Sequence, residues 1–128
     1  MRHIDSIIVH CSDTPNDRDV TVEEIRDWHI NGNGWDEIGY HFIIYRNGSL
    51  MMGRPVPIMG AHCIGYNSHS IGVCFIGRDE FTKEQFETLR TLRRVVQSVF
   101  GDLSVYGHRD LNKHKTCPGF DVKEVLTN

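Results

Sequence analysis

Apolar and β-branched residues gather in short runs along the chain, and these runs predict the strands of a sheet. The first run is almost continuously apolar, which predicts an interior strand covered on both faces. The pair Asn47-Gly48 favours a two-residue type I′ turn, so the runs on either side of it predict a β-hairpin. Strands are expected at residues 6–11, 40–45, 49–52, 70–77 and 103–106.

A capping box predicts the start of a first helix. Thr21 and Glu24 have the T-x-x-E spacing in which two side chains satisfy backbone N–H groups of the first turn. Gly32 or Gly34 is expected to end this helix. The apolar positions predict an inner face made of Val22, Ile25, Trp28 and His29.

A second capping box, Thr82 with Gln85, predicts a long helix that Gly101 ends. Apolar residues recur along it at three- and four-residue spacing and predict a buried face of Phe86, Leu89, Leu92, Val96 and Val99. The opposite face is interpreted as solvated and carries Arg90, Arg93, Arg94 and Gln97. Asp121 is expected to cap a last short helix that runs through Leu126.

The order of these elements predicts the fold class. A hairpin requires antiparallel pairing, whereas strands separated by helices can pair in parallel. We therefore expect a mixed α/β fold with a central mixed β-sheet flanked by helices. The length of 128 residues fits one domain, so residues 1–128 are expected to form a single domain.

Composition and charge exclude several functional classes. The formal net charge is −3 and the sequence pI is about 6.2, which is not the basic footprint of a nucleic-acid-binding domain. No apolar run approaches the length of a membrane span, and the chain reaches Asp5 without the apolar core of a signal peptide. We expect cytoplasmic synthesis, no membrane partner and reduced thiols at the four scattered cysteines.

The histidines raise the possibility of metal chemistry. A hydrolytic zinc site needs three protein ligands and one open position, and His10, His108 and Cys117 meet that demand if strand ends bring them together. Spacing alone leaves the ordinary alternative open, in which these are buried histidines and a small apolar cysteine. His114 is a rival ligand because it lies three residues before Cys117.

Six segments together resemble a known family, and they span most of the chain. These segments are residues 8–12, 38–42, 60–62 with 65–67, 70–73, 107–110 and 115–121. The chain is similar to the zinc-dependent N-acetylmuramoyl-L-alanine amidases of type 2, which are related to peptidoglycan recognition proteins. It looks most like the branch that contains phage T7 lysozyme.

The resemblance implies a fold, a reaction and a cofactor. One Zn²⁺ ion is expected at His10, His108 and Cys117, and the substrate is peptidoglycan, cleaved at the amide between N-acetylmuramic acid and L-alanine. Tyr40 is implied to orient water and relay a proton. Lys115 is implied to stabilise the negative charge that develops on the carbonyl oxygen.

The resemblance also implies a substrate cleft. His62, Tyr66 and Asn67 match the segment that lines it, and Trp35 and Arg54 are weaker candidates for its border. His41 is expected on the opposite side of its strand from Tyr40 and is assigned to structure. The remaining cysteines, which match no metal position, are interpreted as core thiols: Cys11, Cys63 and Cys74.

The sequence leaves several alternatives for the biological role of the protein. We expect a phage or prophage endolysin that is monomeric and acts on the cell wall after release, and a cell's own wall-recycling amidase would use the same chemistry. The alternative from another class is a non-catalytic peptidoglycan-binding module. Recognition proteins become such modules when the metal-binding cysteine is replaced, and Cys117 is present here. A structural zinc site would need a fourth protein ligand.

Overall fold

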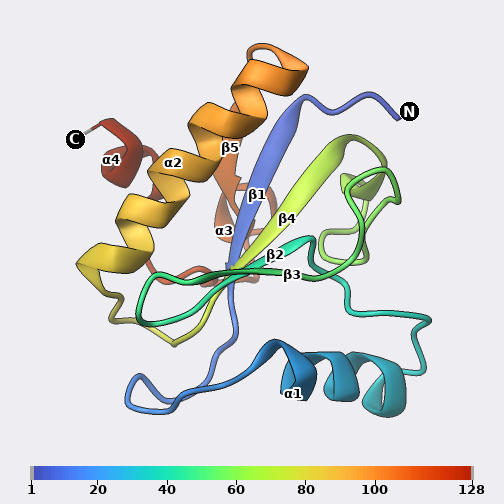
Figure 1. The fold of residues 1–128 in the computed structure, drawn as a ribbon, viewed down its shortest axis with the longest axis vertical. Coiled ribbons are helices and arrows are strands. Elements are labelled where there is room, and N and C mark those ends of the chain that lie inside the picture. Colours follow the sequence, from blue (N-terminus) through green and yellow to red (C-terminus); the bar gives the residue numbers. More distant parts are fainter. Residues whose placement is uncertain (1, 128) are drawn as a thin grey trace.

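One five-stranded β-sheet forms the centre of the structure, a computed structural model that describes residues 2–127. Its strands are β1 (Ser6–Cys11), β2 (Phe42–Ile44), β3 (Leu50–Met52), β4 (Ser70–Phe75) and β5 (Ser104–Gly107). They lie in the order β3-β2-β4-β1-β5 (Figure 1). β2 and β3 are antiparallel, and all other neighbours are parallel. The expected mixed sheet and the interior position of β1 are confirmed.

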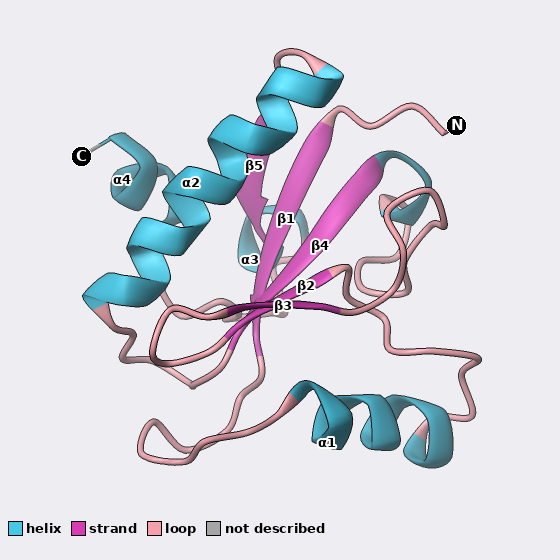
Figure 2. Cartoon of the chain, viewed as in Figure 1, coloured by secondary structure: helices cyan, strands magenta, loops and turns pink. Residues whose placement is uncertain are grey.

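Helices cover both faces of this sheet (Figure 2). They are α1 (Val22–Asp27), which continues as the π-helical turn η1 (Trp28–Gly32), α2 (Lys83–Phe100), α3 (His108–Leu111) and α4 (Val122–Thr127), with the 3₁₀ turn η2 (Asn67–His69) before β4. α2 and α4 pack on one face in a cluster that includes Leu89, Leu92 and Val122. α1 packs on the other through Val22 and Ile25. No helix within residues 2–127 is long and apolar enough to cross a membrane.

Both helix starts agree with the sequence, but parts of the expected faces are wrong. Trp28 is 38% exposed because the α-helix ends at Asp27 and the wider π turn that follows shifts the direction of its side chains. In α2 the buried stripe runs through Leu92 and Val96 to Phe100, which leaves Val99 69% exposed.

The arginine-bearing face of α2 is not fully solvated as expected. Arg90 is half-buried, and its Nε donates a hydrogen bond of 3.2 Å to the carbonyl oxygen of Val125. This bond links α2 to α4. Arg94 is exposed, as the sequence predicted.

The hairpin is confirmed, but its strands are shorter than expected and its turn is of a different type. The N–H of Gly48 donates to the carbonyl oxygen of Tyr45, and the N–H of Tyr45 donates to Ser49. Tyr45 and Ser49 therefore pair just beyond the strand ends, three residues lie between them, and of these only Gly48 has positive φ. A type I′ turn requires positive φ at Asn47 as well. Asn47 instead accepts the N–H of Ser49 through its side chain.

Candidate active site

Three residues far apart in the sequence meet at one end of the sheet. His10 lies near the end of β1, His108 begins α3 directly after β5, and Cys117 lies in the loop that leads to α4. One potential ligand atom from each lies within 4.8 Å of the others, and the ring centroids of His10 and His108 are 4.6 Å apart. Within residues 2–127, no fourth His, Cys, Asp or Glu joins this group, and His114 is outside it.

Strand register explains why the two histidines meet. β1 and β5 are parallel, and Val9 lies opposite Gly107, so the next residue of each segment is a histidine. Parallel strands place their carboxyl ends on one edge of a sheet, where side chains from distant segments converge. Gly107 is held in place because its N–H donates to the Asp110 carboxylate at 2.8 Å.

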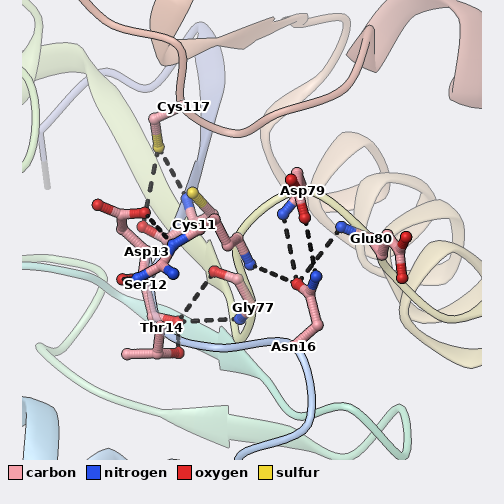
Figure 3. A network of polar contacts seen from close by, with 10 residues as sticks. Cys11, Ser12, Asp13, Thr14, Asn16, Gly77, Asp79, Glu80 and Cys117 are labelled. Carbon is pink, nitrogen blue, oxygen red and sulfur yellow. Dashed lines mark hydrogen bonds and ion pairs between the residues drawn. The ribbon is translucent and has the colours of Figure 1, made fainter.

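Cys117 is fixed by two backbone contacts. Its Sγ accepts the N–H of Cys11 at 2.8 Å, and its carbonyl oxygen accepts the N–H of Arg109 at 2.7 Å. Figure 3 shows the sulfur beside the backbone of Cys11 at the end of β1. The loop between α3 and α4 (residues 112–121), called the site loop, is therefore attached both to β1 and to α3, which places the thiol next to the two imidazoles.

The loop after β1 is also tied to the loop after β4, as Figure 3 shows. The N–H of Gly77 donates to Oγ of Ser12, and the side-chain oxygen of Asn16 accepts the N–H groups of residues 78–80. Asp13 has φ 55° and its carboxylate accepts a hydrogen bond from Arg78 at 2.8 Å. These contacts hold one rim of the site.

The three residues line a cavity of about 580 Å³ that also contains Tyr40, His62 and Lys115. The Tyr40 ring lies 5.2 Å from that of His10 and precedes β2. Lys115 is exposed on the site loop. The structure therefore brings both expected catalytic residues to the expected metal ligands.

The electrostatic surroundings keep the imidazoles neutral. Burial lowers the pKa of His10 well below its ordinary value, and repulsion from His62 and His108 in their protonated forms lowers it further. Burial and the Lys115 ammonium lower the pKa of His108. A neutral imidazole has a free lone pair, which is the form that binds a metal ion.

The thiol and the phenol are both held protonated in the absence of a cation. The side-chain contact with the Cys11 thiol, followed by burial, raises the pKa of the Cys117 thiol, whereas the Cys11 backbone N–H acts in the opposite direction. Burial raises the pKa of the Tyr40 phenol well above its ordinary value, with smaller contributions from Cys74 and Cys117. The thiolate thus needs a nearby positive charge, and Tyr40 carries an O–H that can donate a hydrogen bond.

The expected substrate-binding residues are in three different situations. His62 is half-buried at the inner wall of the cavity, and its Nδ1 lies 2.9 Å from Nε2 of His10. Asn67 lies in an adjoining hollow and accepts the N–H groups of His62 and Cys63 through its side chain. Tyr66 lines a separate hollow and its ring contacts that of His69, so the structure does not bring it to the cavity.

The residues at the border differ from the sequence expectation. Trp35 lines the cavity, but the Arg54 guanidinium donates to the carbonyl oxygens of Glu37, Ile38 and Met59 and lines none of it. His29, which was expected only on an inner helix face, also lines the cavity and accepts the N–H of Gly39 at Nδ1. The sequence pattern did not predict this position, because it placed His29 on the inner face of a helix, whereas the α-helix ends at Asp27.

All four cysteines are free, as expected, and Cys63 and Cys74 are buried. Cys11 is buried too but lines the cavity beside Cys117, so it is more than a core thiol. His41 is fully buried and accepts the N–H of Gly72 at Nδ1, which confirms its structural assignment.

Acid is expected to destabilise the metal-free protein, because buried neutral histidines take up protons on unfolding. Burial lowers the pKa of His41 to about 4 and that of His62 to about 3, whereas the ordinary value is 6.5. Between these values the unfolded chain binds more protons than the folded one. The free energy of unfolding therefore decreases as the pH is lowered below 6.5, by about 1.4 kcal/mol per pH unit for each group at most.

Urea titrations between pH 7 and pH 4.5 measure this slope. His41→Asn retains an acceptor for the Gly72 N–H and should reduce the slope. A free energy of unfolding that does not change over this range would contradict the prediction.

Comparison with known proteins shows which family has this sequence and fold. Residues 1–120 match the protein family described as N-acetylmuramoyl-L-alanine amidase. The endolysin of Klebsiella phage KP32 is 41% identical over 125 residues, which cover 91% of this chain and 82% of that protein. The endolysin of Escherichia phage T7 is 39% identical over 127 residues, with 93% and 83% covered. The solved structure of the N-acetylmuramoyl-L-alanine amidase LysC from Clostridium intestinale URNW has a TM-score of 0.87 at 27% identity and covers 98% of this chain and 85% of LysC.

The fold and its relatives define an α/β amidase. The chain belongs to the N-acetylmuramoyl-L-alanine amidase family. It is an enzyme that hydrolyses the amide bond between N-acetylmuramic acid and L-alanine in peptidoglycan, and its similarity to endolysins connects this activity with phage lysis. The family, the fold class and the reaction expected from the sequence are thus confirmed.

Proposed function

We propose that this hydrolysis depends on one zinc ion held by His10, His108 and Cys117, within a single catalytic domain that spans residues 1–128. The observation that carries the proposal is the convergence of two imidazoles and one thiol, with ligand atoms within 4.8 Å of one another, in the lining of one cavity. This donor set suits zinc, and three protein ligands leave a fourth position for water or substrate. Bound there, the ion would supply Lewis acidity that activates water and polarises the amide carbonyl.

The charge balance of the site supports the same cofactor. Two neutral imidazoles and one thiolate reduce the charge of a dication to about +1. The pKa of the Cys117 thiol is raised in the protein alone, so a dication supplies the charge that stabilises its thiolate form. The Cys11 N–H donates to the same sulfur and favours the thiolate further.

Two residues of the cavity are assigned to the chemistry. Tyr40 keeps its phenolic proton and orients water through hydrogen bonds beside His10. Lys115 brings an ammonium group to the same cavity, where it stabilises negative charge on the carbonyl oxygen of the scissile amide. The leaving amine of L-alanine must gain the proton that the attacking water loses, and the Tyr40 hydroxyl relays it by donating its own proton to the amine and taking up that of water.

The alternatives have less support. A recognition module without hydrolysis would not need Cys117, and the thiol is positioned here by two backbone contacts. A structural zinc site would need a fourth protein ligand, and none joins the group within the part of the chain that the structure describes.

Digestion of purified peptidoglycan with and without a chelator tests the proposal. We expect release of stem peptides with new L-alanine amino termini, identified by mass spectrometry, and loss of this release when the chelator is present. Restoration by Zn²⁺ after removal of the chelator is the control. Peptide release that persists in the metal-free protein would overturn the zinc dependence, and cleavage between sugars would indicate a glycosidase.

A further inference from the structure

His62 lies beside His10, the expected metal ligand on β1, and the reaction itself gives His62 no role. We propose that His62 and Ser70 form a hydrogen-bond relay that fixes the tautomer of His10 and leaves Nδ1 of His10 free for the ion. The inference rests on the proposed zinc site. It makes His62 a positioning residue that acts through His10, in place of the substrate contact expected from the sequence.

The direction of the relay is set at its outer end. The Ser70 hydroxyl lies 2.7 Å from the carbonyl oxygen of Tyr66, and a carbonyl oxygen can only accept. The hydroxyl proton of Ser70 is therefore committed to Tyr66. Nε2 of His62 lies 3.3 Å from the same Oγ, so the ring must donate its N–H to a hydroxyl oxygen that is left to accept.

The same reasoning gives the direction of the hydrogen bond between His62 and His10. A neutral His62 with its proton on Nε2 has a bare lone pair on Nδ1. This Nδ1 lies 2.9 Å from Nε2 of His10, so His10 must be the donor of that bond. The proton of His10 is then on Nε2, and Nδ1 is the nitrogen with a free lone pair. The opposite tautomer would direct an N–H toward the ion.

A narrow slot holds the His62 ring in this orientation. A Cβ added at Gly72 would lie 2.6 Å from the ring, and one added at Gly60 would lie 2.7 Å from it. Ser70 and Gly72 are two residues apart on β4, so they share the face of the sheet that the ring covers. The Asn67 side chain accepts the backbone N–H of His62 at 3.0 Å. Backbone and ring are thus both constrained, which supports a positioning role.

This arrangement predicts how metal affinity depends on His62. Hydrogen-bond partners behind a ligating histidine set its tautomer and ring orientation, and their loss typically lowers metal affinity by about 10- to 100-fold. Asn and Leu have nearly the same shape, and Oδ1 of Asn occupies the place of Nδ1 of His. His62→Asn therefore keeps the acceptor for His10, whereas His62→Leu removes it.

Zinc affinity of the two variants, measured in competition with a chromophoric chelator, tests the relay. We expect His62→Leu to bind Zn²⁺ about 10- to 100-fold more weakly than the natural protein, and His62→Asn to remain within a few-fold of it. Equal affinity in His62→Leu and the natural protein would overturn the proposal, as would an equal loss in both variants.

Nitrogen-15 NMR of the metal-free natural protein provides an independent test that needs no variant to fold. The His10 proton is expected on Nε2, and Ser70→Ala should produce a measurable fraction of the other tautomer because it removes the group that sets the direction. A proton on Nδ1 of His10 in the natural protein would overturn the relay.

These measurements use neither peptidoglycan nor turnover, so they separate this inference from the proposed function. If zinc affinity depends on His62 but hydrolysis does not depend on zinc, only the proposed zinc-dependent function is contradicted. If hydrolysis depends on zinc but zinc affinity does not depend on His62, only the proposed hydrogen-bond relay is contradicted.

Discussion

Replacement of His108 by alanine is expected to remove both stoichiometric zinc and peptidoglycan hydrolysis, whereas His114→Ala should retain both. His108 belongs to the group whose ligand atoms lie within 4.8 Å of one another, and the pairing of β1 with β5 places it beside His10. His114 lies on the same site loop and lines the same cavity, but its side chain is exposed and outside the group.

The physical reason for so large an effect is the loss of one of only three protein ligands. Two ligands cannot compete for the ion with water and buffer, so the Lewis acid of the reaction is lost together with the metal. Elemental analysis of the purified variants and the release of stem peptides are the two measurements. Loss of zinc in His114→Ala alone would show that the wrong histidine has been assigned.

Tyr40→Phe is expected to lower turnover by about 100- to 1,000-fold while zinc content stays at one ion per chain. The substitution removes only the hydroxyl group, and the ring still fills its place 5.2 Å from that of His10. What is lost is the donor that orients water and relays a proton to the leaving amine. Tyr106→Phe is the matched control, because Tyr106 lies on β5 and lines a different hollow.

Lys115→Ala should produce a loss of similar size through a different step, since it removes the charge that stabilises the carbonyl oxygen. Lys113→Ala, on the same loop but outside the cavity, is its control. Steady-state release of stem peptides, together with zinc analysis, measures both effects. Turnover close to that of the natural protein in either variant would remove that residue from the mechanism.

Local sequence signals predicted most elements of the fold because caps, glycines and apolar spacing act over a few residues. Thr21 and Thr82 cap the two main helices as expected. The hairpin turn and the exposure of Trp28 were predicted wrongly. In both cases a nearby interaction decided the geometry: the Asn47 side chain accepted a turn N–H, and a π turn replaced the regular helix.

The sequence was sufficient to predict the metal-ligand candidates, but it was not sufficient to predict which residues line the substrate cleft. His10, His108 and Cys117 stand at strand and loop ends, and a family resemblance connected them, although spacing alone left His114 open. The segment around His62 and Tyr66 matched the same family, yet one residue lies against His10 and the other in a separate hollow.

By itself, the sequence determined the order of the elements, the mixed sheet, the family and the residue types available for a metal site, because these depend on local spacing and chemical identity. Only the tertiary structure decided that His62 contacts a residue 52 positions earlier and that Ser70 sets the direction of the hydrogen bonds. Hydrogen-bond polarity depends on which groups meet after β1 and β4 pair and the loop before β4 folds over them. No periodicity along the chain encodes that meeting.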